Sequence, residues 1–411
     1  MIALPRAVAD ILETLHKNGY RAYAVGGCVR DTLLGRTPHD WDVASDAAAE
    51  TVKGLFPRTI DTGLRHGTVT VLCPAMAVEV TTFRRDGDYS DRRRPDSVSF
   101  TDSLREDAAR RDFTVNAMYY NESEGLVDCF GGQNDLASCL IRAVGNPFTR
   151  FDEDALRILR AGRFAAELGF AVEAETHRAM EGQKRLLRHI SRERIGAELS
   201  RALLGDVARG FGLFLETGCL YEIDERLSAV TADKLAACAH LPALLPLRWA
   251  CVLMGANEPE QILRGLRADN HTLRQVRLLL EHVADPLGSD YAMRRFAADW
   301  GIDALGGLIQ LRLTYGGGTP AEQLGRKETE WERAHQSEAQ RLERLIREGG
   351  FLTKKELQIN GADLLQMGLK EGRAVGALLD QLFDEVLRGS LPNRHERLME
   401  EARRRINGWP R

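Results

Sequence analysis

Strand-type and helix-type patterns occupy different parts of this 411-residue chain, and this division limits the possible folds more than any other feature. Short β-type runs lie within residues 1–145, separated by Gly, Pro and Asp. They are Arg21–Val25, Trp41–Ala44, Gly67–Leu72 and Val78–Thr82, with a helical pattern at Val29–Leu34. From Asp152 onward helical periodicity dominates. The sequence therefore predicts an α+β protein with a small mixed-sheet head, followed by an elongated part that is entirely helical.

Glycines and helix-capping patterns predict further divisions in the helical part. Three glycines follow Tyr315, and the next four residues, Thr319–Glu322, form a capping-box pattern with proline at the first helical position. This pattern predicts a long charged helix that ends near Glu348. Thr353–Glu356 is a second capping-box pattern, which begins the last helical block. We therefore expect four parts: a head at 1–145, a neck at 146–205, a body at 206–318 and a tail at 319–411.

Composition excludes several classes of protein. The 56 basic and 60 acidic residues give a net charge of −4, so any nucleic-acid contact must come from local basic patches. The most apolar stretch, 241–256, is interrupted by Pro242, Pro246 and Arg248, which predicts that no segment spans a membrane. The seven cysteines include no CxxC pair, which predicts reduced thiols and a cytoplasmic location, with neither a disulfide framework nor a zinc site.

Two glycines between a predicted strand and a predicted helix indicate a phosphate-binding position. Gly26 and Gly27 let backbone amides approach an anion closely, and the start of the helix adds partial positive charge. Arg30 adds a charge-assisted hydrogen bond. Taken alone, the two glycines also fit a plain turn.

Carboxylates near this position predict a magnesium site. Asp40 and Asp42 lie two residues apart on a predicted strand, so we expect both to point to the same face. Two such charges repel unless a cation lies between them, and Mg²⁺ prefers carboxylate and phosphate oxygens. Glu79, on a later strand, is a candidate for a third oxygen ligand and a catalytic role. A solvated strand face is the alternative, but the order and spacing of these motifs together favour the metal site.

A second constellation in the neck predicts recognition of a nucleotide base. Asp154 and Arg157 are expected one turn apart on the same side of a helix. An ionised Asp accepts hydrogen bonds and Arg donates them, which complements the amino group and ring nitrogen of cytosine or adenine and rejects uracil and guanine. Arg160 and Arg163 continue as a basic stripe suited to a triphosphate. A surface ion pair remains the alternative for Asp154 and Arg157.

The head motifs resemble those of a known enzyme family. The segment 26–31 followed by Asp40-Trp41-Asp42 resembles the signature of class II nucleotidyltransferases of the DNA polymerase β superfamily. The most similar members are the bacterial CCA-adding tRNA nucleotidyltransferases, and the segments 110–118, 128–132 and 153–164 extend the resemblance. It implies that Asp40 and Asp42 hold two Mg²⁺ ions, that Arg111 contacts the sugar or phosphates of the nucleotide, and that Asp154 and Arg157 select the base.

The resemblance also implies the reaction and its partners. The expected reaction is the template-independent addition of C, C and A to the 3′ end of tRNA from CTP and ATP, with release of pyrophosphate. The tail would bind tRNA, and no obligatory protein partner is expected. In the family, enzymes that finish with A carry a flexible loop at the position of the aperiodic, charged segment 84–96, and a solvated hairpin tip is the alternative for this segment.

Other readings of the sequence stay open. An A-adding or CC-adding enzyme, or a poly(A) polymerase, would share the head motifs. A non-catalytic RNA-binding or nucleotide-binding protein on the same fold is a different class, but intact Asp40, Asp42 and Arg111 argue against it. A basic strip in the neck fits either RNA-backbone contact or a charged solvent face. Its members are Lys184, Arg185, Arg188, Arg192 and Arg194.

Overall fold

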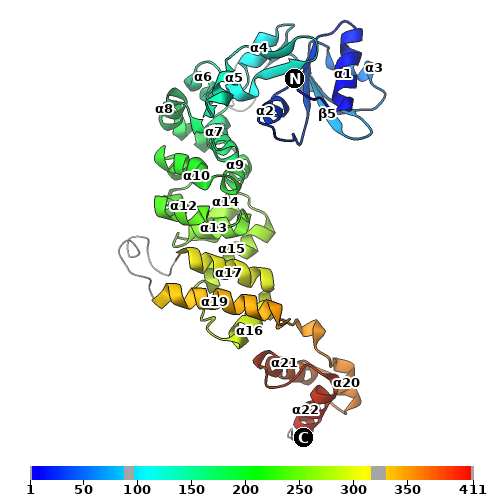
Figure 1. Cartoon of the computed structure of the whole chain (residues 1–411), viewed down its shortest axis with the longest axis vertical. Coiled ribbons are helices and arrows are strands. Elements are labelled where there is room, and N and C mark those ends of the chain that lie inside the picture. Colours follow the sequence, from blue (N-terminus) through cyan, green and yellow to red (C-terminus); the bar gives the residue numbers. More distant parts are fainter. Residues whose placement is uncertain (1, 88–96, 316–329, 409–411) are drawn as a thin grey trace. The chain divides into compact units, whose positions relative to one another are not determined.

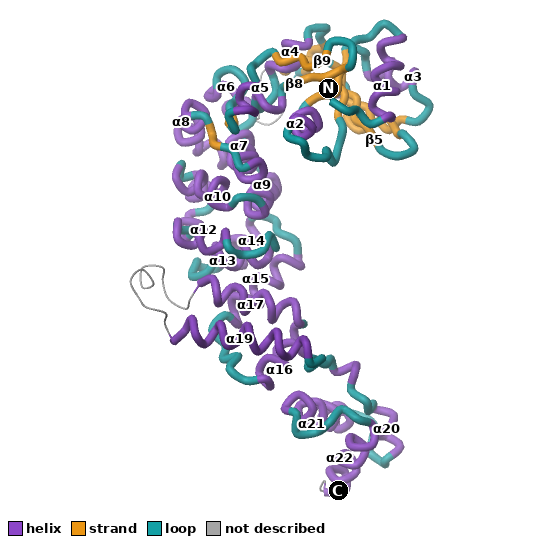
Figure 2. Tube along the Cα trace, in the orientation of Figure 1, coloured by secondary structure: helices purple, strands orange, loops and turns teal. Residues whose placement is uncertain are grey.

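The computed structural model describes residues 2–87, 97–315 and 330–408 of the chain (Figure 1). The chain packs into two compact units, one made of residues 1–235 and 255–268 and the other of 236–254 and 269–411. Among the described residues, strands occur only up to Val172, and helices make up most of the remainder (Figure 2). The α+β class with a mixed-sheet head is therefore confirmed. The predicted boundary at 145 falls inside the first unit, and the division into four parts stays a prediction.

A seven-stranded sheet forms the centre of the head, in the order β3-β4-β5-β2-β1-β8-β9. Its strands are β1 (Ala22–Val25), β2 (Asp42–Ser45), β3 (Thr59–Gly63), β4 (Thr68–Leu72), β5 (Ala77–Thr82), β8 (Met118–Asn121) and β9 (Gly125–Asp128). The pair β2–β5 is parallel and the other neighbouring pairs are antiparallel, so the sheet is mixed as predicted. The four predicted runs became β1, β2, β4 and β5, whereas the sequence did not predict β3, β8 and β9.

The register of the central strands shows which side chains share a face of the sheet. Asp42 lies opposite Glu79 on β5 and opposite Val25 on β1. Directly opposed residues point to the same face, and the next residues along, Val43 and Val80, point to the other. Both valines are buried, on the face where α1 (Arg6–Lys17) and α3 (Ala49–Leu55) contact the sheet (Figure 1). Asp42 and Glu79 therefore lie on the face that these two helices leave uncovered.

Aromatic packing stabilises the face that carries Asp42. The ring centroids of Tyr23 on β1 and Tyr119 on β8 lie 6.2 Å apart at right angles, and Phe83 packs against both. Ala108 of α4 (Leu104–Ala109) belongs to the same buried cluster. Edge-to-face ring pairs of this kind add about 0.5–1.5 kcal/mol beyond their buried area. The face that carries Asp42 therefore rests on a rigid aromatic base.

The segment predicted to be a flexible loop has structured ends. Arg84–Asp86 form β6, which pairs with β7 (Val98–Phe100) in a two-stranded antiparallel ribbon. Residues 88–96 of the predicted loop lie outside the described residues. The prediction of irregular structure is therefore wrong for Arg84–Asp86, where backbone pairing with β7 overrides a charged sequence without periodicity.

Helices build the remainder of the first unit. They are α2 (Gly27–Leu33), α5 (Gly132–Ala137), α6 (Pro147–Glu153), α7 (Leu156–Leu168), α8 (Ala174–Gln183), α9 (Arg192–Leu204), α10 (Val207–Glu216), α11 (Cys219–Ile223) and α14 (Pro259–Gly265). A short parallel pair, β10 (Leu140–Ile141) and β11 (Ala171–Val172), also belongs to this unit. Gly196 on α9 permits a very close approach to another backbone, because a Cβ there would lie 2.1 Å from the carbonyl oxygen of Leu266.

The described part of the second unit is helical. Its helices are α13 (Leu245–Leu253), α15 (Asn270–His282), α16 (Asp290–Trp300), α17 (Ile302–Tyr315), α19 (Glu330–Arg347), α20 (Gly361–Gln366), α21 (Arg373–Arg388) and α22 (His395–Gly408), while α12 (Ala232–Ala239) begins in the first unit. The second capping box is confirmed, since Thr353 and Glu356 bond reciprocally, but it opens a single 3₁₀ turn. The first capping box lies outside the described residues. No helix within the described ranges is long and apolar enough to cross a membrane.

Candidate nucleotide and metal site

Gly26 and Gly27 bring two arginines close to the backbone between β1 and α2. Gly26 has φ 84°, a conformation that side chains with a Cβ rarely adopt. A Cβ at Gly26 would lie 3.4 Å from Nη1 of Arg111, and one at Gly27 would lie 3.6 Å from Nη2 of Arg30. The structure therefore brings Arg30 and Arg111, two of the five arginines that the sequence assigned to nucleotide binding, next to the two glycines.

Arg30 is held in place by side chains from two directions. Its Nη1 donates to Oδ1 of Asn116 at 2.5 Å, and its Nε donates to Oδ1 of Asp31 at 2.8 Å. The guanidinium lies 5.3 Å from the ring centroid of Phe164 on α7. Only 8% of Arg30 is exposed. Arg30 thus offers a fixed positive charge beside the glycines.

Asp107 holds Arg111 in place, and the sequence analysis missed this role. Arg111 donates to Oδ2 of Asp107 at 3.2 Å and to the hydroxyl of Tyr119 at 3.0 Å, and that hydroxyl donates to the same oxygen at 2.6 Å. Burial alone would raise the pKa of Asp107, but the charges of Arg111 and Arg110 lower it to about 2. The i,i+4 spacing of Asp107 and Arg111 was a signal that could have revealed the pair.

The carboxylates form a partial cation site. Asp42 begins β2 and lies opposite Glu79, whereas Asp40 precedes the strand. The protein around the Asp42 carboxyl group removes water from it, and Glu79 and Asp40 add negative charge. Together these effects raise the pKa of Asp42 to about 6 against the opposing charge of Arg111. Within the described ranges, no three His, Cys, Asp or Glu side chains are already arranged around a metal position.

The donor set nevertheless fits a divalent cation in its chemistry. Asp42 and Glu79 lie on neighbouring strands and supply carboxylate oxygens. Their negative charges repel each other, and a bound cation would relieve this repulsion. Asp40 precedes β2 instead of lying within it, but its charge acts on Asp42, so the two carboxylates are close to one another. The shared face expected for Asp40 and Asp42 stays a prediction.

The structure separates Asp154 from the helix that carries Arg157. Helix α6 ends at Glu153, Asp154 follows it with an extended backbone, and α7 begins at Leu156. Oδ1 of Asp154 accepts the backbone N–H of Leu156 at 3.1 Å, and Oδ2 accepts Nη2 of Arg194 at 2.9 Å. The expectation of one shared helical face is therefore wrong, since Asp154 caps the helix instead of lying within it.

Arg157 bonds to protein groups through both terminal nitrogens. Nη1 donates to Oε2 of Glu153 at 2.6 Å and to the carbonyl oxygen of Arg150 at 2.9 Å, and Nη2 donates to the carbonyl oxygen of Arg110 at 2.9 Å. Only 8% of Arg157 is exposed. These bonds fix Arg157 against the end of α4, close to the segment that carries Arg111.

The predicted basic stripe differs between its two members. Arg160 donates to Oδ2 of Asp112 at 2.8 Å and remains partly exposed. Arg163 is 3% exposed and pairs with Glu198 at 2.6 Å and with Glu167 at 3.1 Å. Arg163 therefore faces carboxylates inside the protein and does not present its charge to a ligand. Of the two arginines expected to contact a triphosphate, only Arg160 has a partly exposed side chain.

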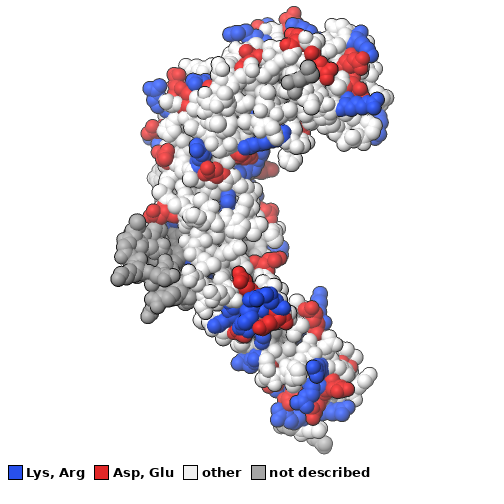
Figure 3. All heavy atoms as spheres, in the orientation of Figure 1, with Lys and Arg blue, Asp and Glu red and all other residues white. Residues whose placement is uncertain are grey.

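The basic strip of the neck is largely occupied by internal partners. Arg188 pairs with Glu222, Arg192 and Lys184 donate to backbone carbonyl oxygens, and Arg194 pairs with Asp154. Basic and acidic side chains also alternate over α16 and α19 of the second unit (Figure 3), where Arg344 pairs with Asp290 at 2.6 Å. Four of the five members of the neck strip therefore bond to other protein groups, and contact of the strip with RNA stays a prediction.

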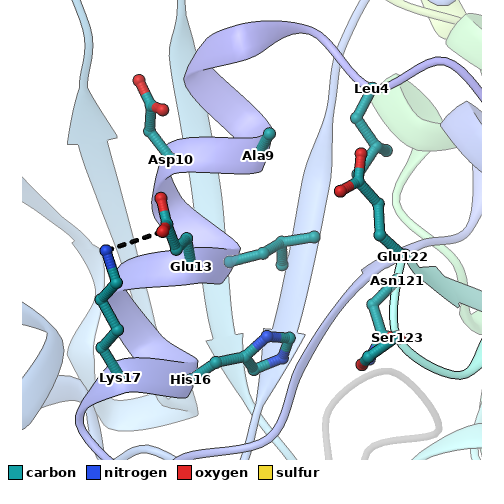
Figure 4. A pocket seen from close by; sticks show the side chains of 10 residues that line it. Leu4, Ala9, Asp10, Glu13, His16, Lys17, Asn121, Glu122 and Ser123 are labelled. Atoms are coloured by element: carbon teal, nitrogen blue, oxygen red, sulfur yellow. Dashed lines mark hydrogen bonds and ion pairs between the residues drawn. The ribbon is translucent and has the colours of Figure 1, made fainter.

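A separate cavity of about 480 Å³ lies between α1 and the turn that joins β8 to β9 (Figure 4). Its lining includes His16, Glu122 and Ser123, together with the ion pair of Lys17 and Glu13 at 2.6 Å. None of the predicted metal or nucleotide residues lines this cavity. The cavity is therefore separate from the candidate site, which is formed in the head by Gly26, Asp42 and Arg111, with Arg157 bonded to the neighbouring carbonyl of Arg110.

Comparisons with known proteins agree with this geometry. Residues 22–142 match the family model of the poly A polymerase head domain, residues 169–225 that of a probable RNA and SrmB-binding site of polymerase A, and residues 308–402 that of a putative tRNA nucleotidyltransferase domain 2. The CCA-adding enzyme of Geobacillus stearothermophilus is 37% identical over 405 residues, which cover 96% of each chain.

Solved structures show the same fold. The crystal structure of the Bacillus stearothermophilus CCA-adding enzyme in complex with CTP has a TM-score of 0.76 and 34% identity and covers 98% of each chain. The Thermotoga maritima CCA-adding enzyme complexed with tRNA has a TM-score of 0.67 at 18% identity, covering 98% of this chain and 97% of its own. Because relatives of this similarity span nearly the whole sequence, the chain belongs to the family of CCA-adding enzymes.

Proposed function

We propose that this protein adds C, C and A to the 3′ end of tRNA in the cytoplasm, using CTP and ATP and releasing pyrophosphate. The observation that carries the proposal is the full-length similarity to a CCA-adding enzyme, 37% identical, together with the intact site in the head. A solved relative holds CTP and another holds tRNA, which supports these substrates for this chain.

The head residues would bind the triphosphate and hold the metal. Arg30 and Arg111 place fixed positive charge beside the backbone of Gly26 and Gly27, which suits phosphate oxygens. Asp42, Glu79 and Asp40 would hold Mg²⁺, with Asp40 and Asp42 binding two ions. Bound Mg²⁺ would supply the charge that activates the RNA 3′-hydroxyl and stabilises the leaving pyrophosphate. Asp107 keeps Arg111 oriented throughout, since its carboxylate is buried and fully hydrogen-bonded.

The neck residues would select the base without a template. Asp154 offers acceptors and Arg157 offers donors, which together complement the amino group and ring nitrogen of cytosine and adenine. Glu153 and the carbonyl of Arg110 fix the direction of Arg157. Arg160, partly exposed between Asp112 and Phe164, would contact the nucleotide from the same side.

Extension of a defined RNA tests the proposal. A tRNA lacking its last three nucleotides is incubated with Mg²⁺, CTP and ATP, and the product is sized. We expect addition of three nucleotides, and we expect Asp42→Asn to abolish it. Asp61→Asn is the matched control, because Asp61 pairs with Lys53 on the head surface, away from the site.

The product lengths separate the alternatives. Addition of a single A, and only to a tRNA that already ends in CC, would identify an A-adding enzyme. A product that stops after two C residues would identify a CC-adding enzyme. Extension far beyond three nucleotides would identify a poly(A) polymerase. Binding of tRNA and nucleotide without any incorporation would refute an enzymatic function.

A further inference from the structure

The carboxylate of Asp154 has two anchors that come from different elements. On one side the backbone N–H of Leu156, at the start of α7, donates to Oδ1 at 3.1 Å. On the other side Arg194, from the first turn of α9, donates to Oδ2 at 2.9 Å and reaches Oδ1 at 3.5 Å. Both side chains are partly enclosed, with 26% of Arg194 and 16% of Asp154 exposed. The guanidinium therefore spans both carboxylate oxygens.

Arg157 does not provide this anchor. Its two terminal nitrogens donate to Glu153, to the carbonyl of Arg150 and to the carbonyl of Arg110. The carboxylate that is proposed to face the base is thus oriented by an arginine forty residues along the chain. Sequence spacing gave no indication of this pair.

We propose that Arg194 is a positioning residue for base selection, which fixes the Asp154 carboxylate so that it accepts one amino group from cytosine or adenine. The inference rests on the proposed function. Arg194 acts through Asp154 and need not touch the base itself.

Counting hydrogen-bond positions gives the physical reason. An ionised carboxylate offers about four acceptor positions. The fork of Arg194 takes two of them and the N–H of Leu156 takes one, which leaves about one position directed to the site. Cytosine and adenine each present one amino group there, whereas the carbonyl of uracil or guanine would leave two acceptors facing each other.

Without Arg194, the carboxylate keeps only its bond to Leu156. It can then rotate about its side-chain torsions and face bases of different shapes, because partly exposed side chains change rotamer readily. The expected result is a loss of discrimination, and not merely a loss of stability. An ordinary ion pair between two helices would affect only stability.

The chain provides a matched control on the same helix. Arg201 lies seven residues after Arg194, on the same face of α9, and pairs with Glu167 of α7 at 2.8 Å. Glu167 keeps its pair with Arg163 when Arg201 is removed. Arg201→Gln therefore removes an ion pair between α9 and α7 without affecting the carboxylate of Asp154.

The experiment measures kcat and KM for CTP, ATP, UTP and GTP in single additions to the appropriate tRNA. For Arg194→Gln we expect the preference for CTP over UTP to fall by about 10-fold or more, with a raised KM for CTP. Arg194→Lys should restore part of the preference, since an ammonium donates to one carboxylate oxygen but cannot span both. Arg201→Gln should keep the preference of the wild type.

A double variant and a binding measurement complete the test. If Arg194 acts through Asp154, the variant carrying both Asp154→Asn and Arg194→Gln should show the preference of Asp154→Asn alone. Equilibrium binding of labelled CTP and UTP to the same variants gives the preference without turnover. A wild-type preference in Arg194→Gln, or equal losses for all four nucleotides, would overturn the inference. Failure of the wild type to add C and A, with selective CTP binding that Arg194→Gln weakens, would overturn only the proposed function.

Discussion

Replacement of Asp107 by asparagine tests how the head holds Arg111, the arginine that we propose binds the nucleotide. Asp107 is fully buried and accepts hydrogen bonds from Arg110, Arg111 and Tyr119, and from the backbone N–H of Arg84. Asparagine has the same shape but no charge, and its amide N–H₂ must face groups that are themselves donors. Arg111 therefore loses its counter-charge and its fixed direction.

The size of the effect follows from the pKa of Asp107. The folded protein lowers this pKa from 3.8 to about 2, and one pKa unit corresponds to about 1.4 kcal/mol, so the carboxylate contributes roughly 2–3 kcal/mol at pH 7. Because the folded pKa is depressed, this stability is fully present above pH 4 and is lost as the pH falls toward 2. With the added donor conflict, we expect Asp107→Asn to lower the free energy of unfolding by about 3 kcal/mol at pH 7.

The assay uses the one tryptophan of the first unit. Trp41 is buried in the head, and the other four tryptophans lie after residue 248, so fluorine NMR of 5-fluorotryptophan-labelled protein follows the head alone during denaturation. The difference between wild type and variant should stay constant from pH 7 to 5 and shrink by about half near pH 3. Asp61→Asn, at a surface ion pair, should change stability by less than about 0.5 kcal/mol.

Two results would refute this reasoning. A difference below about 1 kcal/mol at pH 7 would mean that the Asp107 network contributes little net stability. A difference that does not change between pH 5 and pH 3 would mean that the charge of Asp107 is not its source. Either result would leave Arg111 to be oriented by Tyr119 alone.

Three further predictions concern packing, phosphate binding and the metal. Gly196→Ala should destabilise the first unit by about 1–3 kcal/mol in the same fluorine NMR assay, because the new Cβ would lie 2.1 Å from the carbonyl oxygen of Leu266. Gly212→Ala in α10 is the contrast: a Cβ there has no atom within 4 Å, so this variant should stabilise the unit by about 0.5–1 kcal/mol. Arg111→Lys should raise the KM for CTP at least about 10-fold with little change in tRNA binding, because the single nitrogen of lysine cannot span Tyr119, Asp107 and a phosphate as the separate nitrogens of the guanidinium do. An unchanged KM would exclude nucleotide contact. Chelation with EDTA should stop incorporation and Mg²⁺ should restore it, and activity that persists in EDTA would contradict the metal proposal.

The sequence predicted the centre of the sheet better than its edges. Strands β1, β2, β4 and β5 have clear apolar patterns because their residues are buried on at least one face. Strand β3 has mostly exposed, polar residues, so nothing in its composition separates it from a loop. Strand β8 is fully buried, but its short segment follows a 3₁₀ turn and is recognisable only through its pairing with β1.

The candidate site shows the same limit of local patterns. Glu79 was expected on a later strand, and its pairing with Asp42 follows from the parallel register of β2 and β5, which the sequence does not contain. Asp154 did not follow its expected helical period, since it lies between α6 and α7. That boundary is not marked by glycine or proline, the usual signals of an element's end. The contacts of Asp107 with Tyr119 and of Asp154 with Arg194 depend on tertiary packing, which a pattern along the sequence does not contain.

The single parallel pair of the sheet has a consequence for how the site forms during folding. The segment that joins Asp42 to Glu79 is a crossover that runs through α3, β3 and β4. The second edge of β1 pairs with β8, which comes still later in the chain. Non-local pairings of this kind slow folding, because the chain loses the entropy of closing a long loop before any stabilising contact has formed. The two carboxylates therefore meet only after the crossover has formed. A head in which α3, β3 and β4 are not yet in place lacks the pairing of Asp42 with Glu79 on which the proposed metal site depends.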